Sequence, residues 1–151
     1  MIVDEASGVV LEPGTDVELV TLNLAGLDEA ELLALFPTPV QCAGALLKAR
    51  ASVTRAPAVL NKYRTALAAR ERDLTIALAK AARDLLADYP RMPMTERRDL
   101  ARAEASAVRE AQEARDTAWL LLQYAKDRKD SLFEDIGILR SLNANFRGEH
   151  R

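Results

Sequence analysis

The sequence contains little of the material from which active sites and metal centres are usually built. It has one cysteine (Cys42), one histidine (His150), six glycines and only 5% aromatic residues. A single cysteine excludes an intramolecular disulfide and suits a reducing cytoplasm. A zinc site needs more Cys or His ligands than the chain has, and its few glycines form no phosphate-binding loop. We therefore expect a protein without catalytic residues, metal or cofactor, and not an enzyme.

A long hydrophobic run is also missing. The longest uncharged stretch, 32–47, contains Pro37 and Pro39 and is too short to span a bilayer. The first residues, MIVDEASG, have neither the basic region nor the apolar core of a signal peptide. These features predict a cytoplasmic protein that does not bind a membrane.

Positive charge is absent from the first part of the chain. Residues 1–37 contain eight acidic residues and no Lys or Arg, whereas residues 38–151 carry a net charge of +6. One interpretation is a solvated acidic arm. Another is an arm that lies against the basic body, or screens a basic surface until a partner arrives.

The N-terminal region differs from the rest in its residue pattern. Two runs rich in β-branched residues, 8–11 and 17–24, flank a Pro-Gly turn and predict a small β-hairpin or extended arm. Asp28 can cap a short helix that ends near Phe36. We expect an acidic N-terminal arm at 1–27 and a helical hairpin domain at 28–151.

Two long helices are predicted, at 39–89 and from Thr95 to about Phe146. Each has an apolar residue at every seventh position, which is typical of helices that pack lengthwise. In the first helix these residues are Leu60, Leu67, Leu74 and Ala81; in the second they are Ala111, Ala118, Ala125, Leu132, Leu139 and Phe146. We expect a mainly α fold, a long antiparallel coiled-coil-like hairpin.

The stretch DYPRMPMTE, 88–96, separates the two helices. Its two prolines predict a tight turn at 90–94, and Thr95 is the expected N-cap of the second helix. Folding the chain back here places Lys80 opposite Glu104. Pro57 should kink or break the first helix, opposite a charged run at 126–130 where the apolar repeat of the second helix lapses.

One stretch predicts an interface. Its apolar side chains point around more than half a helical turn, so a single partner helix cannot cover them all. The residues are Trp119, Leu120, Leu121, Leu122 and Tyr124. The short helix, the N-terminal arm or a second copy of the chain would cover the remainder.

Two arginine clusters are possible nucleic-acid contacts, one at the hairpin turn and one near the C-terminus. They comprise Arg91, Arg97, Arg98 and Arg102, and Arg140 and Arg147. The second cluster is equally explained by the helix dipole, which favours cations in the last turn. The sequence pI of about 5.5 disfavours a nucleic-acid-binding role.

The C-terminal stretch DIGILRSLNANFR, 135–147, follows a long helix rich in Ala, Arg and Glu. It resembles the ends of small helical accessory proteins of temperate phages of high-GC bacteria, many of them uncharacterised. The resemblance covers about the last third of the chain. It implies a non-enzymatic phage or prophage protein.

The sequence thus leads to a protein-interaction or assembly protein, with a protein partner or a homo-oligomer. One alternative is a nucleic-acid-associated accessory factor of replication or recombination. Another is an inhibitor whose acidic arm occupies a host protein.

Overall fold

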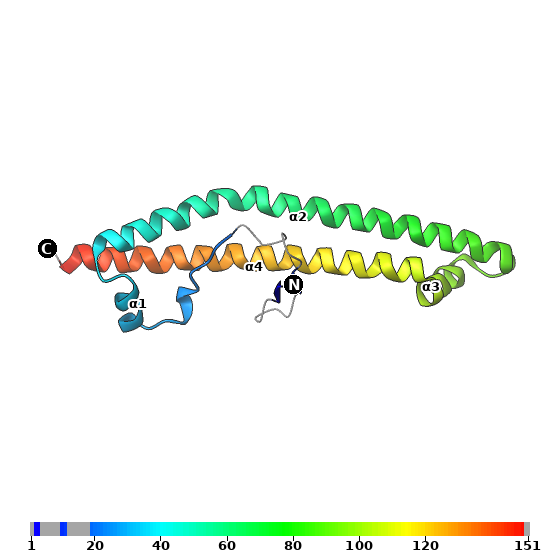
Figure 1. Ribbon diagram of the computed structural model, residues 1–151. Coiled ribbons are helices and arrows are strands. Elements are labelled where there is room, and N and C mark those ends of the chain that lie inside the picture. Colours follow the sequence, from blue (N-terminus) through cyan, green and yellow to red (C-terminus); the bar gives the residue numbers. More distant parts are fainter. Residues whose placement is uncertain (1, 4–9, 12–18, 150–151) are drawn as a thin grey trace. The chain divides into compact units, whose positions relative to one another are not determined.

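A computed structural model describes residues 2–3, 10–11 and 19–149 of the chain (Figure 1). The fold is mainly helical, as predicted. The elements, in chain order, are β1 (Ile2–Val3), β2 (Val10–Leu11), the 3₁₀ turn η1 (Leu24–Gly26), α1 (Glu29–Leu35), α2 (Pro39–Asp88), α3 (Met94–Glu104) and α4 (Ser106–Glu149).

The N-terminal arm is not shown in its predicted form. β1 and β2 pair antiparallel over two residues each, with Ile2 opposite Leu11. The second predicted strand was 17–24, but residues 19–23 form no strand and η1 begins at Leu24. Residues 12–18, which include the predicted turn, lie outside the described residues, so a boundary at residue 27 stays a prediction.

The short helix predicted after Asp28 is confirmed. Asp28 is the N-cap of α1, and its Oδ1 accepts a hydrogen bond of 2.8 Å from the backbone N–H of Glu31. The acidic residues of the first turn suit the positive end of the helix dipole. The helix ends at Leu35, just before Pro37.

Pro57 does not break α2, so of the two predicted outcomes, a kink or a break, the break does not occur. The helix runs from Pro39 to Asp88 with Pro57 inside it. Pro57 is exposed, so the carbonyl four residues earlier, which loses its N–H partner, lies on the solvent side of the helix. Water can bond to it there, which reduces the cost of an interior proline.

The turn after α2 is confirmed, but its cap is not. α2 ends at Asp88, and the backbone N–H of Met92 bonds to the carbonyl of Tyr89 at 3.1 Å. α3 begins at Met94 with Pro93 as its N-cap, without a side-chain cap bond. Thr95 therefore lies inside the first turn of the helix, and its prediction as the cap is wrong.

The single helix predicted from Thr95 to Phe146 is also wrong, because Ala105 interrupts it. Ala105 has extended backbone angles (φ −76°, ψ 117°) between α3 and α4. Continuing the seven-residue repeat back from Ala111 would place the charged Glu104 at a core position, which is costly. The interruption instead buries Ala101 and Val108, each 1% exposed.

The chain divides into two compact units, 1–61 with 123–151, and 62–122. Each contains an antiparallel pair of segments from α2 and α4. In the first unit, Cys42 Sγ lies 3.4 Å from the carbonyl of Leu139. In the second, Arg115 Nη2 lies 3.7 Å from Glu71 Oε1. Lys80 and Ala105 line one groove of that unit, in agreement with the predicted register.

Candidate functional site

The structure divides the predicted interface stretch into an accessible and an inaccessible part. Trp119 and Leu120 are each 42% exposed, and Leu121 is half-buried. Leu122 and Tyr124 are buried, with 5% and 7% of their surface exposed. Only Trp119 and Leu120 are therefore freely open to a partner.

Polar side chains one helical turn before Trp119 and Leu120 form a rim. Gln112 Nε2 donates to Asp116 Oδ1 at 3.0 Å, and Arg115 Nη1 lies 3.3 Å from the same oxygen. An apolar centre with a polar margin is the usual anatomy of a protein–protein contact. Trp119 and Leu120 form such a centre on α4.

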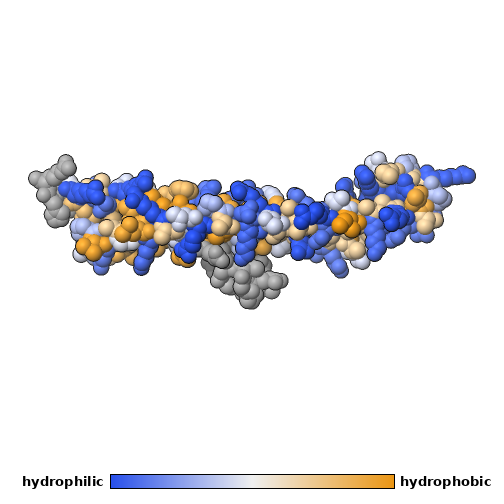
Figure 2. Space-filling model, turned by 90° about the horizontal axis from the view of Figure 1, so that it is seen from above, coloured by the Kyte–Doolittle hydropathy of each residue, from blue (hydrophilic) through white to orange (hydrophobic). Residues whose placement is uncertain are grey.

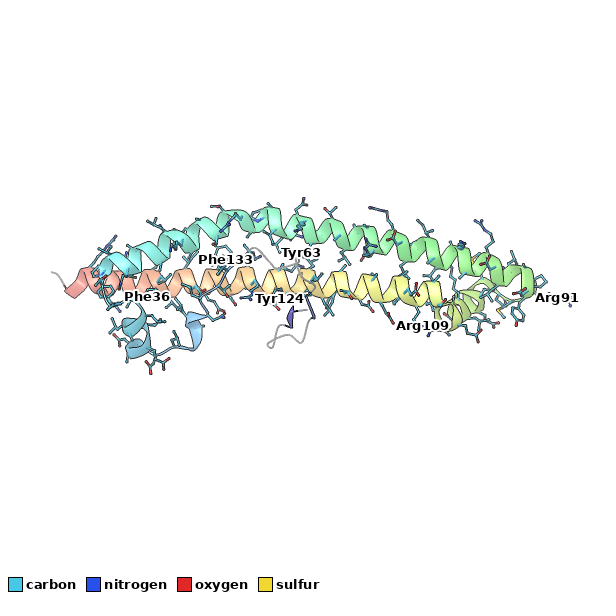
Figure 3. All side chains as sticks on the ribbon, in the orientation of Figure 1. Phe36, Tyr63, Arg91, Arg109, Tyr124 and Phe133 are labelled. Carbon is cyan, nitrogen blue, oxygen red and sulfur yellow. The ribbon has the colours of Figure 1, made fainter. Side chains whose placement is uncertain are left out.

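The arginines at the turn do not form a uniformly basic surface. Arg91 lies in the turn between α2 and α3 (Figure 3) and is exposed, as are Arg98 and Arg102. Arg97 is half-buried, and its Nε has no hydrogen-bond partner among the described residues. The acidic residues of the same turn, Asp88, Glu96 and Asp99, are exposed beside them. On the face seen in Figure 2, hydrophilic and apolar side chains are interspersed.

The C-terminal arginines lie near a third arginine, Arg50, which the sequence alone did not place with them. Arg140 and Arg147 of α4 and Arg50 of α2 line one groove of about 380 Å³. Among the described residues, no carboxylate lines this groove and none forms an ion pair with these three arginines. The described lining of the groove is therefore positively charged.

A buried carboxylate ties the segment 19–24 to α4. Asp135, 1% exposed, accepts hydrogen bonds from the backbone N–H groups of Leu22 (2.8 Å) and Leu24 (3.0 Å). Between them Asn23 has a positive φ of 54°, which lets both N–H groups turn toward one side chain. The buried Leu19 and Leu24 pack beneath the segment's ends.

Arg128 makes a second connection one heptad earlier. Its Nη1 donates to Thr21 Oγ1 at 2.8 Å, and its Nε donates to the hydroxyl of Tyr124 at 2.8 Å. The guanidinium carbon also lies 5.1 Å from the centre of the Tyr124 ring, a cation–π contact. These bonds account for the burial of Tyr124, which the sequence analysis had placed in an interface.

Sequence reasoning missed Asp135, although a signal for it existed. Asp135 and Arg128 lie at seven-residue spacing from Leu121 and Leu142, so both occupy positions of the apolar repeat. A charge at such a position predicts a polar partner in the interior. The sequence predicts that the apolar repeat of the second helix lapses at 126–130. It does not predict that the segment 19–24 contacts α4 near this lapse.

A cavity of the first unit that is open to solvent lies beside this segment. It measures about 760 Å³ and contains side chains from one face of α2, from the end of α1, from the segment 19–24 and from α4. Its lining residues are Val20, Leu22, Leu35, Phe36, Gln41, Gly44, Ala45, Lys48, Ala49, Ala51, Ser52, Arg55 and Leu132. The cavity is therefore mostly apolar, and Lys48 and Arg55 are its charged groups.

Two observations on the described part of the chain concern its cysteine and its possible metal ligands. Cys42 is buried, and desolvation raises the pKa of its thiol above the usual value, which lowers the fraction of reactive thiolate. Among residues 19–149, no three His, Cys, Asp or Glu side chains are grouped to hold a metal ion. His150 lies outside the described residues.

No single helix in the described ranges is both long and apolar enough to cross a membrane. α1 and α2, which meet at 90°, pass that test of length and composition only when they are taken together.

Comparison with known proteins gives no relative for this chain. No protein-family model matches the sequence, and neither the curated proteins nor the solved structures contain a match.

Proposed function

We propose that this chain is a non-enzymatic protein-interaction or assembly protein, built as a long antiparallel helical hairpin and of phage or prophage origin. The interaction surface includes Trp119 and Leu120. The observation that supports this function is the exposure of these two adjacent large apolar side chains, 42% each, beside the polar side chains of the preceding turns of α4.

Trp119 is a strong candidate for the centre of a contact. Tryptophan is enriched among the residues that contribute most to binding energy, and this chain has only one. Two side chains cannot supply the roughly 800 Å² per partner of a stable interface, so the flanking turns of α4 must contribute too. A second copy of the chain or another protein's helix can match such a surface.

The self-assembly form of this proposal is tested by molar mass in solution at several concentrations. We expect the wild-type mass to rise with concentration and Trp119→Glu to remain a monomer, because the new carboxylate would be desolvated in the contact. Leu86→Glu is the matched control, since Leu86 is an equally exposed (43%) leucine of the same unit. If wild type and Trp119→Glu are both monomeric throughout, self-assembly is wrong.

A second candidate is a nucleic-acid-associated accessory factor of replication or recombination. The groove lined by Arg50, Arg140 and Arg147 favours it, because unpaired guanidinium groups suit phosphate oxygens. The logarithm of the binding constant should fall steeply and linearly with the logarithm of the salt concentration. The slope of this line should become shallower by about one unit for each phosphate contact removed.

The double variant Arg140→Gln/Arg147→Gln tests this candidate in a titration of single- and double-stranded DNA. The control is Arg72→Gln, which removes one exposed arginine far along α2 from Arg50. Affinity that does not change with salt, or an equal loss in the control, would exclude the C-terminal groove as the contact.

A further inference from the structure

We propose that the 760 Å³ cavity of the first unit binds a single-chain anionic amphiphile, such as a fatty acid, with its carboxylate on Arg55. This inference is independent of the proposed function, because it concerns other residues. It follows from the size of the cavity and from the chemistry of its lining, which among the described residues contains no carboxylate.

The dimensions of the cavity suit an acyl chain. Its volume lies within the roughly 300–1,000 Å³ of small-molecule sites. Its lining on α2 runs from Gln41 to Arg55, which at 1.5 Å per residue is roughly 21 Å. An acyl chain that covers half of a bilayer's hydrocarbon core is about 15 Å long. Such a chain fits along the cavity with room for its head group.

The apolar lining includes side chains that remain exposed to solvent in the free protein. Val20 is 71% exposed, Leu22 46% and Leu35 55%, and all three border the same cavity. Phe36, at the end of α1 (Figure 3), lines the same cavity. A bound acyl chain would remove part of this apolar surface from water, which is the main source of affinity for such a ligand.

The charge of the lining selects the ligand's head group. Among the described lining residues, Lys48 and Arg55 are cationic, Gln41 and Ser52 are polar and uncharged, and none is acidic. Neither cation forms an ion pair with another described residue. A cationic, mostly apolar cavity favours an anion with a long apolar body over a neutral or cationic amphiphile.

Arg55 is the better placed of the two cations. Its Nη2 donates to Ser52 Oγ at 3.2 Å, and Ser52 itself is only 7% exposed. This bond restricts the guanidinium group, which can then bind a carboxylate through two parallel N–H donors. Lys48 lies seven residues away, roughly 10.5 Å along the helix, so its apolar stem lies beside the chain rather than the head group.

The walls of the cavity are positioned without ligand. Val20 and Leu22 belong to the segment that Asp135 holds through the N–H groups of Leu22 and Leu24. Preorganised walls lower the entropic cost of binding.

Calorimetric titration of the full chain with dodecanoate, below its micelle-forming concentration, tests the proposal. We expect saturable binding to one site, weaker binding of dodecanol and weaker still of dodecyltrimethylammonium. Arg55→Gln should weaken dodecanoate binding about tenfold or more, through loss of a charge-assisted hydrogen bond. Lys48→Gln should have a smaller effect.

Gly44→Leu provides a variant that fills the cavity without loss of stability. A Cβ at Gly44 meets no atom within 4 Å, and leucine is a better helix former than glycine. We expect this variant to unfold at the same or a higher temperature and to lose dodecanoate binding. Gly137→Leu is the matched control, because Gly137 is also helical, has equally open space and lines a different groove.

Three results would each overturn the proposal. The first is no saturable dodecanoate binding by the wild type. The second is equal affinity for dodecanoate and dodecanol. The third is wild-type dodecanoate affinity in the Gly44→Leu variant.

Discussion

Replacement of Asp135 by asparagine should release the segment 19–24 from α4. Asp135 accepts two charge-assisted hydrogen bonds, from the N–H groups of Leu22 and Leu24. An asparagine of the same shape has one carbonyl oxygen, so it can accept from one N–H while its NH₂ group faces the other. Each bond to a charged group contributes about 1.5–3 kcal/mol and a neutral one about 1.

The expected loss is therefore about 3 kcal/mol of local stability, after the remaining neutral bond is subtracted. Since 1.36 kcal/mol corresponds to a factor of ten, the amides of Leu22 and Leu24 should exchange with solvent more than a hundredfold faster. Hydrogen exchange followed by NMR measures both amides directly, and it reports local opening separately from global unfolding.

Asp130→Asn is the control for this experiment. Asp130 lies on the same helix, its side chain is 70% exposed, and among the described residues its carboxylate pairs with the neighbouring Lys129. Its replacement should leave both amides unchanged. Equal exchange rates for Leu22 and Leu24 in Asp135→Asn and in the wild type would refute the assignment of Asp135 as the residue that holds this segment.

Two further predictions concern α1 and the cysteine. Asp28→Ala removes the cap of α1 and should cost about 1 kcal/mol, seen as faster exchange of the Glu31 amide with little change in global unfolding. Burial raises the pKa of Cys42, so the unfolded chain gives up this proton first and stability should fall as pH rises above the ordinary pKa of a thiol. Urea denaturation across alkaline pH, with Cys42→Ala as the control that lacks this dependence, measures the effect.

Local chain chemistry made part of the fold predictable from the sequence. The cap of α1 and the turn after α2 depend on interactions within a few residues. The structure confirms Asp28 as the cap and places Pro90 and Pro93 in the turn. Thr95 was a reasonable cap by the same logic. It failed because the helix begins one residue earlier, after Pro93, which has no side-chain acceptor to offer.

The break at Ala105 could not be predicted in the same way. Alanine is the best helix former, and nothing local in the sequence stops the helix there. Ala101, Val108 and Ala111 lie at the spacings of one apolar stripe, and the charged Glu104 occupies a position of that stripe next to the break. A charged residue at one such position does not by itself show that the helix ends there.

The sequence pointed to the apolar residues of the candidate site, Trp119 and Leu120, but not to the polar contacts of Arg128. The broad apolar band included Trp119 and Leu120, which the structure leaves 42% exposed, and their role in an interface stays a prediction. It also included Tyr124, whose hydroxyl and ring Arg128 contacts from one turn later on the same helix. The second partner of Arg128, Thr21, comes from a segment distant in the sequence and could not be predicted from local spacing.

Arg128 and Asp135 together explain why the segment 19–24 occupies one position on α4. Leu19 and Leu24 alone could pack at several places along an apolar stripe, because hydrophobic contact is not directional. Hydrogen bonds require defined geometry, and here a cation meets the Thr21 hydroxyl while an anion meets two N–H groups. Leucine at position 135 would bury apolar surface and so recover part of the stability that the hydrogen bonds of Asp135 contribute. It would, however, leave the backbone N–H groups of Leu22 and Leu24 without an acceptor. The two charges in the repeat therefore specify placement more than they add stability, and that placement forms one wall of the cavity.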